Sequence, residues 1–293
     1  MVQTPPLPQD AQQSAADSRA APVNGTAAQA PVFVFDSGVG GLSVLRSLLA
    51  ELPDERFVYL ADSAHVPYGD RPQTFIVERT LAIARYAREA CGAKAFVIAC
   101  NTATAAAVAQ VRAHWPDWVV VGIEPAVKPA ALQTRTGVIG ILATSNTLAS
   151  ERFSGLVEGF ASDCRVVAQP CPGLVECIEA GDIDGPDVRR LLTGFVGALV
   201  EQGADVIVLG CTHYPFVAPV VQALAGPAVQ VLETGEAVAR ETRRRLTVDG
   251  LLAESGCGGL PPLSLLATGS VQALQASASR LLGLSVLPLQ VAC

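Results

Sequence analysis

Two cysteines stand in sequence settings that could support acid–base chemistry. Cys100 ends the apolar run AFVIAC (95–100) and Cys211 ends DVIVLGC (205–211), and each precedes a polar turn that opens a predicted helix. At a helix N-terminus, unpaired backbone N–H groups and the positive end of the dipole favour a thiolate. We therefore expect a lowered pKa for both thiols. A single buried cysteine is commonly inert, so the matched pair is what favours catalysis.

Racemisation is a reaction that needs two such groups. One thiolate takes an α-proton from one face of a carbon, and one thiol returns a proton to the other face. Asn101, Thr102 and Thr212 supply hydrogen-bond donors for a substrate carboxylate. His213 follows Cys211 by two residues and either assists its proton transfers or is a turn or N-cap histidine.

A third polar turn follows the apolar run VFVF (32–35). Ser37 can bind a substrate ammonium or carboxylate, and Asp36 can orient a thiol or hold the ammonium. The turn continues with glycines that let the backbone come close to a ligand, Gly38, Gly40 and Gly41.

Two further positions complete the candidate site. Tyr68 and Gly69 follow a Val-Pro turn and suit a loop at the rim of a site. Glu179 lies in the segment CPGLVECIE and is either a carboxylate of the site or a solvated helix residue. Its sequence context alone slightly favours the solvated position.

The elements that must position these side chains alternate between strands and helices. From Pro31 onward, short β-branched runs precede polar or glycine-rich turns and longer helix-compatible stretches, which is typical of βαβ units. Ligands bind outside the carboxyl ends of the strands in such sheets. Strand-end features recur at similar offsets in the two halves. We predict an α/β fold with two pseudo-symmetric, doubly wound domains, mostly parallel sheets and an active site in the cleft between them.

Composition disfavours several classes of protein. The 293 residues are 50% hydrophobic with a net charge of −7, which suits packed cores and argues against nucleic acid or anionic membranes as partners. Eight cysteines without a C-x-x-C pair indicate a reduced compartment rather than a disulfide scaffold. No apolar stretch is long enough for a transmembrane helix. Residues 1–30 lack the features of a signal peptide and are predicted to be a disordered leader.

Five motifs resemble those of the glutamate racemases, in the wider aspartate/glutamate racemase superfamily. They are FDSGVGGLSVL, YLADSAHVPYG, ACNTATA, GILAT with Thr147 three residues on, and GCTHYPF, within residues 31–283. The resemblance implies that Cys100 and Cys211 are the proton donors and acceptors, helped by His213, Asp36 and Glu179. It implies that the substrate is contacted by Asp36, Ser37, Tyr68, Gly69, Asn101, Thr102, Thr144, Thr147, Thr212 and His213.

The same resemblance implies a function and a domain organisation. The expected reaction interconverts L- and D-glutamate without a cofactor or metal, supplying D-glutamate for peptidoglycan in a bacterial cytoplasm. A homodimer is expected, and regulation by a peptidoglycan precursor stays open. The first domain would comprise residues 31–124 plus 232–283 and carry Cys100. The second would comprise 125–231 and carry Cys211, and 284–293 would form a C-terminal tail.

Several rival functions remain to be compared. An aspartate racemase usually has a Gly-Gly-Met-Gly turn and Thr-Glu after the second cysteine, whereas this chain has DSGVGG and Thr212-His213. A pyridoxal-phosphate enzyme needs a Schiff-base lysine, and only Lys94 and Lys128 are available. GVGG lacks the spacing of nucleotide-binding loops. A thiol hydrolase leaves Cys100 without a role, a zinc site lacks neighbouring ligands, and a two-lobed amino-acid-binding protein needs no thiols.

Overall fold

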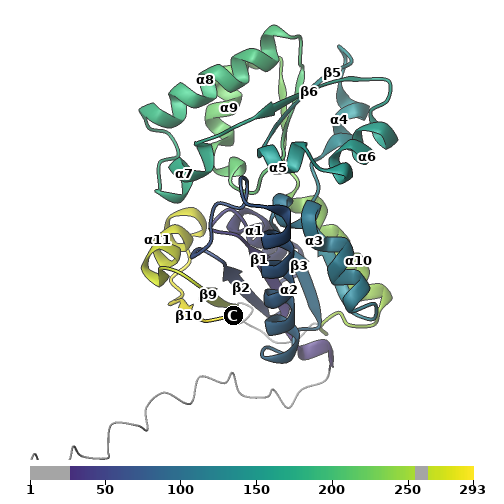
Figure 1. Ribbon diagram of the computed structural model, residues 1–293, viewed down its shortest axis with the longest axis vertical. Coiled ribbons are helices and arrows are strands. Elements are labelled where there is room, and N and C mark those ends of the chain that lie inside the picture. The colour runs from purple at the N-terminus through teal and green to yellow at the C-terminus, as the bar shows by residue number, and fades with distance from the viewer. Residues whose placement is uncertain (1–26, 255–262) are drawn as a thin grey trace, which may run out of the picture.

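Two α/β units stack end to end in the computed structural model, which describes residues 27–254 and 263–293 (Figure 1). The lower unit in Figure 1 contains a six-stranded sheet in the order β10-β9-β2-β1-β3-β4. Every pairing in it is parallel. Its strands are β1 (Val32–Asp36), β2 (Phe57–Ala61), β3 (Ala95–Ile98), β4 (Val119–Gly122), β9 (Leu263–Ala267) and β10 (Leu289–Gln290).

Helices cover both faces of this sheet, so β1 is buried along its whole length. Val32 and Val34 pack in the cluster formed with α1, α10 and α11, whereas Phe33 and Phe35 pack on the other side with α2 and α3. A parallel strand covered on both faces reads as a continuous apolar run, as VFVF does. The helices are α1 (Leu42–Glu51), α2 (Gln73–Glu89), α3 (Asn101–His114), α10 (Gly235–Val248) and α11 (Val271–Leu282).

The upper unit contains a four-stranded parallel sheet in the order β6-β5-β7-β8. Its strands are β5 (Val138–Ala143), β6 (Arg165–Pro170), β7 (Val206–Leu209) and β8 (Gln230–Leu232). Its helices are α4 (Val127–Gln133), α5 (Ser145–Leu148), α6 (Glu151–Phe160), α7 (Leu174–Glu179), α8 (Pro186–Glu201) and α9 (Ala218–Ala225), with the 3-10 helix η3 (Tyr214–Val217) before α9.

The two units share one strand order. In chain order within each unit, strand 2 pairs with strand 1, strand 1 with strand 3, and strand 3 with strand 4. The first unit adds β9 and β10 beyond its second strand. This common order confirms the predicted pair of pseudo-symmetric α/β domains with parallel sheets.

The structure refines the predicted ends of the domains. Residues 289–290 pair with β9 as an edge strand, so the segment assigned to a C-terminal tail is part of the first sheet. Strand β8 reaches Leu232, where the first domain was expected to resume. Of the predicted leader, residues 1–26 lie outside the described residues, and Ala27–Gln29 form a short 3-10 helix.

Candidate active site

Cys100 caps the N-terminus of α3 at the carboxyl end of β3, as the sequence predicts. Its side chain is buried, and Sγ accepts a hydrogen bond from the N–H of Ala103 at 3.4 Å. Ser37 Oγ lies 3.6 Å from Sγ. The expected lowering of the pKa is wrong for this thiol. Burial, followed by the charge of Asp36, raises the pKa of Cys100 to about 12, and the helix N–H only partly opposes this rise.

Cys211 occupies a different local structure from Cys100. Gly210 separates it from β7, and the helix that follows is η3, a 3-10 helix whose N-cap is His213. The predicted polar turn is therefore present, but the helix that it opens is a 3-10 helix that begins three residues after Cys211. Its thiol is buried, and Sγ lies 3.7 Å from Nδ1 of His213. The imidazole supplies the polar contact that the helix end supplies at Cys100.

His213, which is buried, and Glu179, which is partly buried, form a pair beside Cys211. Nε2 of His213 lies 2.6 Å from Oε1 of Glu179, which also accepts the backbone N–H of Val39 at 2.8 Å. Burial opposes charge on both groups. The hydrogen bonds of His213 to Cys211 and Glu179 nevertheless raise the pKa of the imidazole well above its usual value, and the bond to His213 lowers the pKa of Glu179. Glu179 is thus a carboxylate of the site rather than a solvated helix residue.

Asp36 joins the two domains at the end of β1. It is fully buried and accepts hydrogen bonds from the N–H of Gly38 at 2.9 Å and from Thr212 Oγ1 at 3.1 Å. Burial raises the pKa of this carboxyl. Thr212, which donates to Asp36, is the chain neighbour of Cys211, and the charge of Asp36 raises the pKa of Cys100. The carboxyl group of Asp36 therefore acts on the surroundings of both thiols.

The glycine turn passes too close to the second domain for any side chain. A Cβ on Gly38 would lie 1.9 Å from Glu179 Oε1, and one on Gly40 would lie 2.4 Å from Nδ1 of His213. The hydroxyl of Tyr59 donates to the carbonyl of Gly38 at 2.7 Å and holds the turn from behind. A side chain at either glycine would therefore displace a member of the histidine–glutamate pair.

Three threonines form a hydroxyl cluster across the domain boundary. Thr102 Oγ1, from α3, lies 2.9 Å from Thr144 Oγ1 and 3.3 Å from Thr147 Oγ1, and the last two are 2.9 Å apart. Thr144 caps α5 in the second domain. Because each hydroxyl can rotate to donate, the cluster suits a carboxylate ligand.

Asn101 has a buried side-chain amide without a hydrogen-bond partner among the described residues, at both Oδ1 and Nδ2. Buried polar groups are usually paired, so an unpaired amide next to Cys100 and Thr102 indicates a place for a polar ligand. The binding of a carboxylate by Asn101 stays a prediction.

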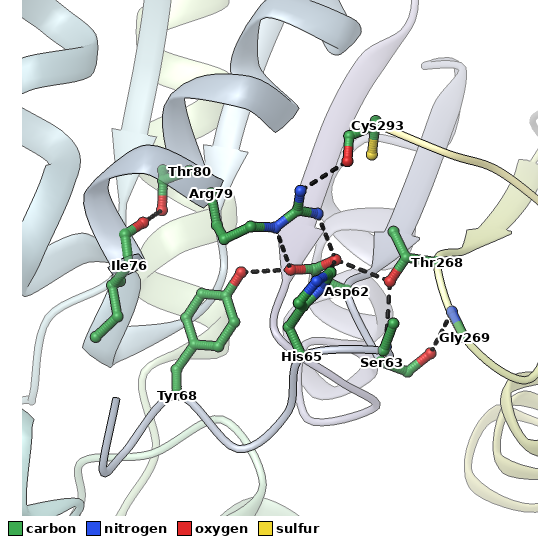
Figure 2. Close-up of polar contacts among 11 residues, drawn as sticks. Asp62, Ser63, His65, Tyr68, Ile76, Arg79, Thr80, Thr268, Gly269 and Cys293 are labelled. Carbon is green, nitrogen blue, oxygen red and sulfur yellow. Dashed lines mark hydrogen bonds and ion pairs between the residues drawn. The ribbon is translucent and has the colours of Figure 1, made fainter. Parts of the chain in front are cut away.

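Tyr68 and Gly69 reach the boundary through their backbone. The Tyr68 hydroxyl donates to Asp62 Oδ2 at 2.6 Å (Figure 2). The carbonyls of Tyr68 and Gly69 accept from the side chain and backbone of Asn146, at 3.1 and 3.4 Å. Neither Asp62 nor Asn146 is among the residues of the predicted site. Their positions in the sequence could have identified them, because Asp62 directly follows β2 and Asn146 lies between Thr144 and Thr147.

The two lysines considered for a Schiff base lie in other settings. Lys94 Nζ is buried 2.5 Å from Glu55 Oε2, before the N-terminal end of β3 and so at the sheet edge opposite to Cys100. Lys128 Nζ lies over the ring of Phe160. In the described part of the chain, no three His, Cys, Asp or Glu residues gather as a metal site. No helix there has the length and apolar character needed to span a bilayer.

Comparisons with known proteins identify a family, similar sequences and similar structures. The profile of the Asp/Glu/Hydantoin racemase family matches residues 39–242. A glutamate racemase of Pseudomonas entomophila is 55% identical over 225 residues, covering 77% of this chain and 84% of the relative. Glutamate racemase RacE1 of Bacillus anthracis superposes with a TM-score of 0.79 at 28% identity, covering 90% and 97% of the two chains.

A further solved relative was determined with ligands. Escherichia coli glutamate racemase, in complex with L-glutamate and the activator UDP-MurNAc-Ala, superposes with a TM-score of 0.77 at 29% identity. The match covers 89% of this chain and 98% of that one. The likeness therefore extends over both domains.

Proposed function

The chain belongs to the glutamate racemases of the Asp/Glu/Hydantoin racemase family and is an isomerase, and from this premise we propose that Cys100 and Cys211 exchange the α-proton of glutamate between its two faces. One observation carries the proposal. Two buried thiols, one from each domain, flank a polar cluster in which Ser37 contacts Cys100 and Thr212, the chain neighbour of Cys211, donates to Asp36. Each thiol also has its own polar neighbour, the N–H of Ala103 or the imidazole of His213.

The proposed proton transfers balance within the pair. A thiolate on one side takes the α-proton and becomes a thiol, and the carbanion is protonated on its other face by the second thiol, which becomes a thiolate. The protein then holds the protonation state that catalyses the reverse reaction. The raised pKa of Cys100 favours its thiol form before the substrate binds. The hydrogen bonds to Glu179 and Cys211 favour a protonated imidazole at His213, which lies 3.7 Å from the thiol of Cys211.

Substrate binding is assigned to the polar groups that surround the thiols. The unpaired amide of Asn101 and the hydroxyl cluster of Thr102, Thr144 and Thr147 supply donors for the carboxylates. Asp36 holds the ammonium: burial alone disfavours the charged carboxylate, and the positive charge of the substrate beside it offsets that cost. Ser37, Thr212, Tyr68 and Gly69 complete the contacts, the last two through the backbone of their loop.

The proposed product is D-glutamate for peptidoglycan in a bacterial cytoplasm. The named activator of the Escherichia coli relative, UDP-MurNAc-Ala, carries an N-acetylmuramoyl group, which supports regulation of this chain by a similar compound. A homodimer remains part of the proposal. No cofactor or metal is assigned to the reaction.

The direct test follows the optical rotation of L-glutamate incubated with the purified protein and no added cofactor. We expect the rotation to fall toward zero, with D-glutamate reaching the same end point from the other side. Aspartate, as the substrate of the nearest alternative activity, should react poorly. An unchanged rotation refutes the activity, equal rates on aspartate refute the substrate, and loss of activity with a chelator refutes independence from metal.

A further inference from the structure

Asp62 is a buried carboxylate outside the contacts of the proposed reaction. It directly follows β2, has no exposed surface, and sits at the centre of five polar contacts shown in Figure 2. The donors are Tyr68 at 2.6 Å, Arg79 Nε at 3.1 Å and Nη2 at 2.7 Å, and Thr268 at 2.8 Å, with His65 Nδ1 at 3.0 Å.

The contacts make Asp62 a firm anchor. Burying a carboxylate costs free energy unless hydrogen bonds and an opposite charge compensate for lost water. Burial alone raises the pKa of Asp62, but the bonds from Arg79, Tyr68 and Thr268 bring it below its usual range, so the group is ionised at neutral pH. Arg79 also donates from Nη1 to the backbone oxygen of Cys293 at 2.7 Å, which ties the anchor to the segment after β10.

The loop that starts at this anchor ends against the second domain. Asn146, in α5, donates its side-chain Nδ2 to the carbonyls of Tyr68 at 3.1 Å and Arg71 at 2.9 Å. A Cβ on Gly69 would lie 3.2 Å from Thr144 Cβ. The loop is therefore hydrogen-bonded to Asp62 in the first domain and to Asn146 in the second domain.

The phenol of Tyr68 belongs to the anchor rather than to the reacting centre. Its ring is buried against Phe35 and Phe75, and its hydroxyl is directed to Asp62. The raised pKa of this phenol, caused by burial and by the charge of Asp62, keeps it a neutral donor. Tyr68 thus transmits the position of Asp62 to the backbone carbonyl that Asn146 binds.

We propose that Asp62 and Arg79 are positioning residues that hold the 62–71 loop in the shape on which the second domain closes, and that they thereby set the affinity for the substrate. The kinetic part rests on the proposed racemase function, while the structural part does not. If the loop is released from Asp62, closing the domains must also order the loop. That added entropic cost weakens binding. The thiols and the His213–Glu179 pair do not contact Asp62, so the chemical step is retained.

The chain offers a matched control in Asp205. This carboxylate is also buried and accepts bonds from Thr134, Arg135 and Thr136, but it lies at the N-terminal end of β7, far along the strand from Cys211. Asp62→Asn and Asp205→Asn remove one buried charge each. Only the first should alter the loop.

The kinetic experiment measures KM and kcat for both glutamate enantiomers. Asp62→Asn is expected to raise KM about tenfold, which corresponds to about 1.4 kcal/mol, with kcat within about twofold of the parent protein. Asp205→Asn should leave KM unchanged. Tyr68→Phe deletes only the hydroxyl and should raise KM in the same direction. Its combination with Asp62→Asn should add less than the two separate effects, because both act through one hydrogen bond.

Hydrogen exchange provides the readout that is independent of turnover. In the free full-length protein, amides of residues 63–71 should exchange faster in Asp62→Asn and Tyr68→Phe than in Asp205→Asn. Unchanged exchange in this segment overturns the proposal, even if racemisation itself is absent. An unchanged KM in an active Asp62→Asn protein, or an equal rise in Asp205→Asn, also overturns it. If Asp62→Asn does not fold, the measurements of KM and of hydrogen exchange on Tyr68→Phe test the proposal instead.

Discussion

Glu179 Oε1 lies 2.6 Å from Nε2 of His213, although 34 positions separate these residues in the chain. The same oxygen accepts the N–H of Val39 from the other domain at 2.8 Å. One carboxylate therefore sets the charge of the imidazole beside Cys211 and fixes the glycine turn of the first domain against the second. This double role leads to the first two predictions.

Glu179→Gln should lower the pKa of His213 and slow turnover. The carboxylate raises that pKa by hydrogen bonding and by charge, and glutamine keeps only part of the hydrogen bond. The chain has only 3 histidines, so an NMR titration of the imidazoles can resolve the shift directly. A His213 titration curve identical to that of the parent protein would show that Glu179 does not control the imidazole.

The same pair gives a signed dependence of stability on pH. The pKa of His213 is raised, so its contribution is fully present below about pH 6.5 and is lost as pH rises through the folded value. The pKa of Glu179 is lowered, so its contribution is present above about pH 4.5 and is lost as pH falls. Urea unfolding across pH 4–9 should therefore show the largest destabilisation by Glu179→Gln in the window between those two limits.

Gly38→Ala should disrupt the site despite adding only a methyl group. The new Cβ would lie 1.9 Å from Glu179 Oε1, so the carboxylate must move away from His213. We expect turnover to fall by about an order of magnitude or more, as for other displaced catalytic groups. Gly155→Ala is the control, because its Cβ meets nothing within 4 Å on α6. It should gain about 0.5–1 kcal/mol of stability with turnover retained; a similar loss of turnover in both variants would contradict the assignment.

Asp205→Asn should destabilise the second domain in a pH-dependent way without changing turnover. Burial opposes ionisation, yet hydrogen bonds from residues 134–136 bring the pKa of Asp205 down to about 2. Such a group stabilises the fold above about pH 3.8, and this contribution disappears as pH falls toward 2. We expect a loss on the order of 2 kcal/mol at pH 7, shrinking steadily below pH 4. Denaturant unfolding at several pH values measures this loss of stability. A difference in the free energy of unfolding that stays constant down to pH 3 would contradict the prediction.

The strands and their ends could be predicted from the sequence because burial leaves a clear pattern. VFVF and AFVIAC are continuous apolar runs of strands covered on both faces, and each ends at a polar turn. In parallel sheets the carboxyl ends of the strands lie at one edge, so the sequence pattern predicts Cys100 and Asp36 at the same edge.

The contacts between domains could not be predicted in this way. Glu179 looks like a solvated helix residue until the packing of α7 places it against His213. Burial depth is likewise a tertiary property, which is why the helix end at Cys100 predicted a lowered pKa and the structure gives a raised one. The edge strand at residues 289–290 is too short to have a periodicity of its own.

The two thiols themselves provide the last prediction. Cys100→Ser and Cys211→Ser should each lower racemisation by about two to four orders of magnitude, because a serine hydroxyl cannot readily act as the base. Cys171→Ala is the matched control, since Cys171 is also buried and burial also raises its pKa to about 12. It should affect stability only, because its thiol donates to the carbonyl of Gln169 and is not hydrogen-bonded to any candidate residue of the site in the described part of the chain.

Heavy water distinguishes two bases from one in the unmodified protein. If Cys100 and Cys211 act on opposite faces, product formed from a single enantiomer carries solvent deuterium at the α-carbon, while the remaining substrate stays largely protiated early in the reaction. The base that removed the proton lies on the wrong face to deliver it to the product. A single base would instead return part of the original proton to both substrate and product. Near-normal turnover in either serine variant, or protium retained in the product, would exclude the two-thiol mechanism even in a protein that racemises glutamate.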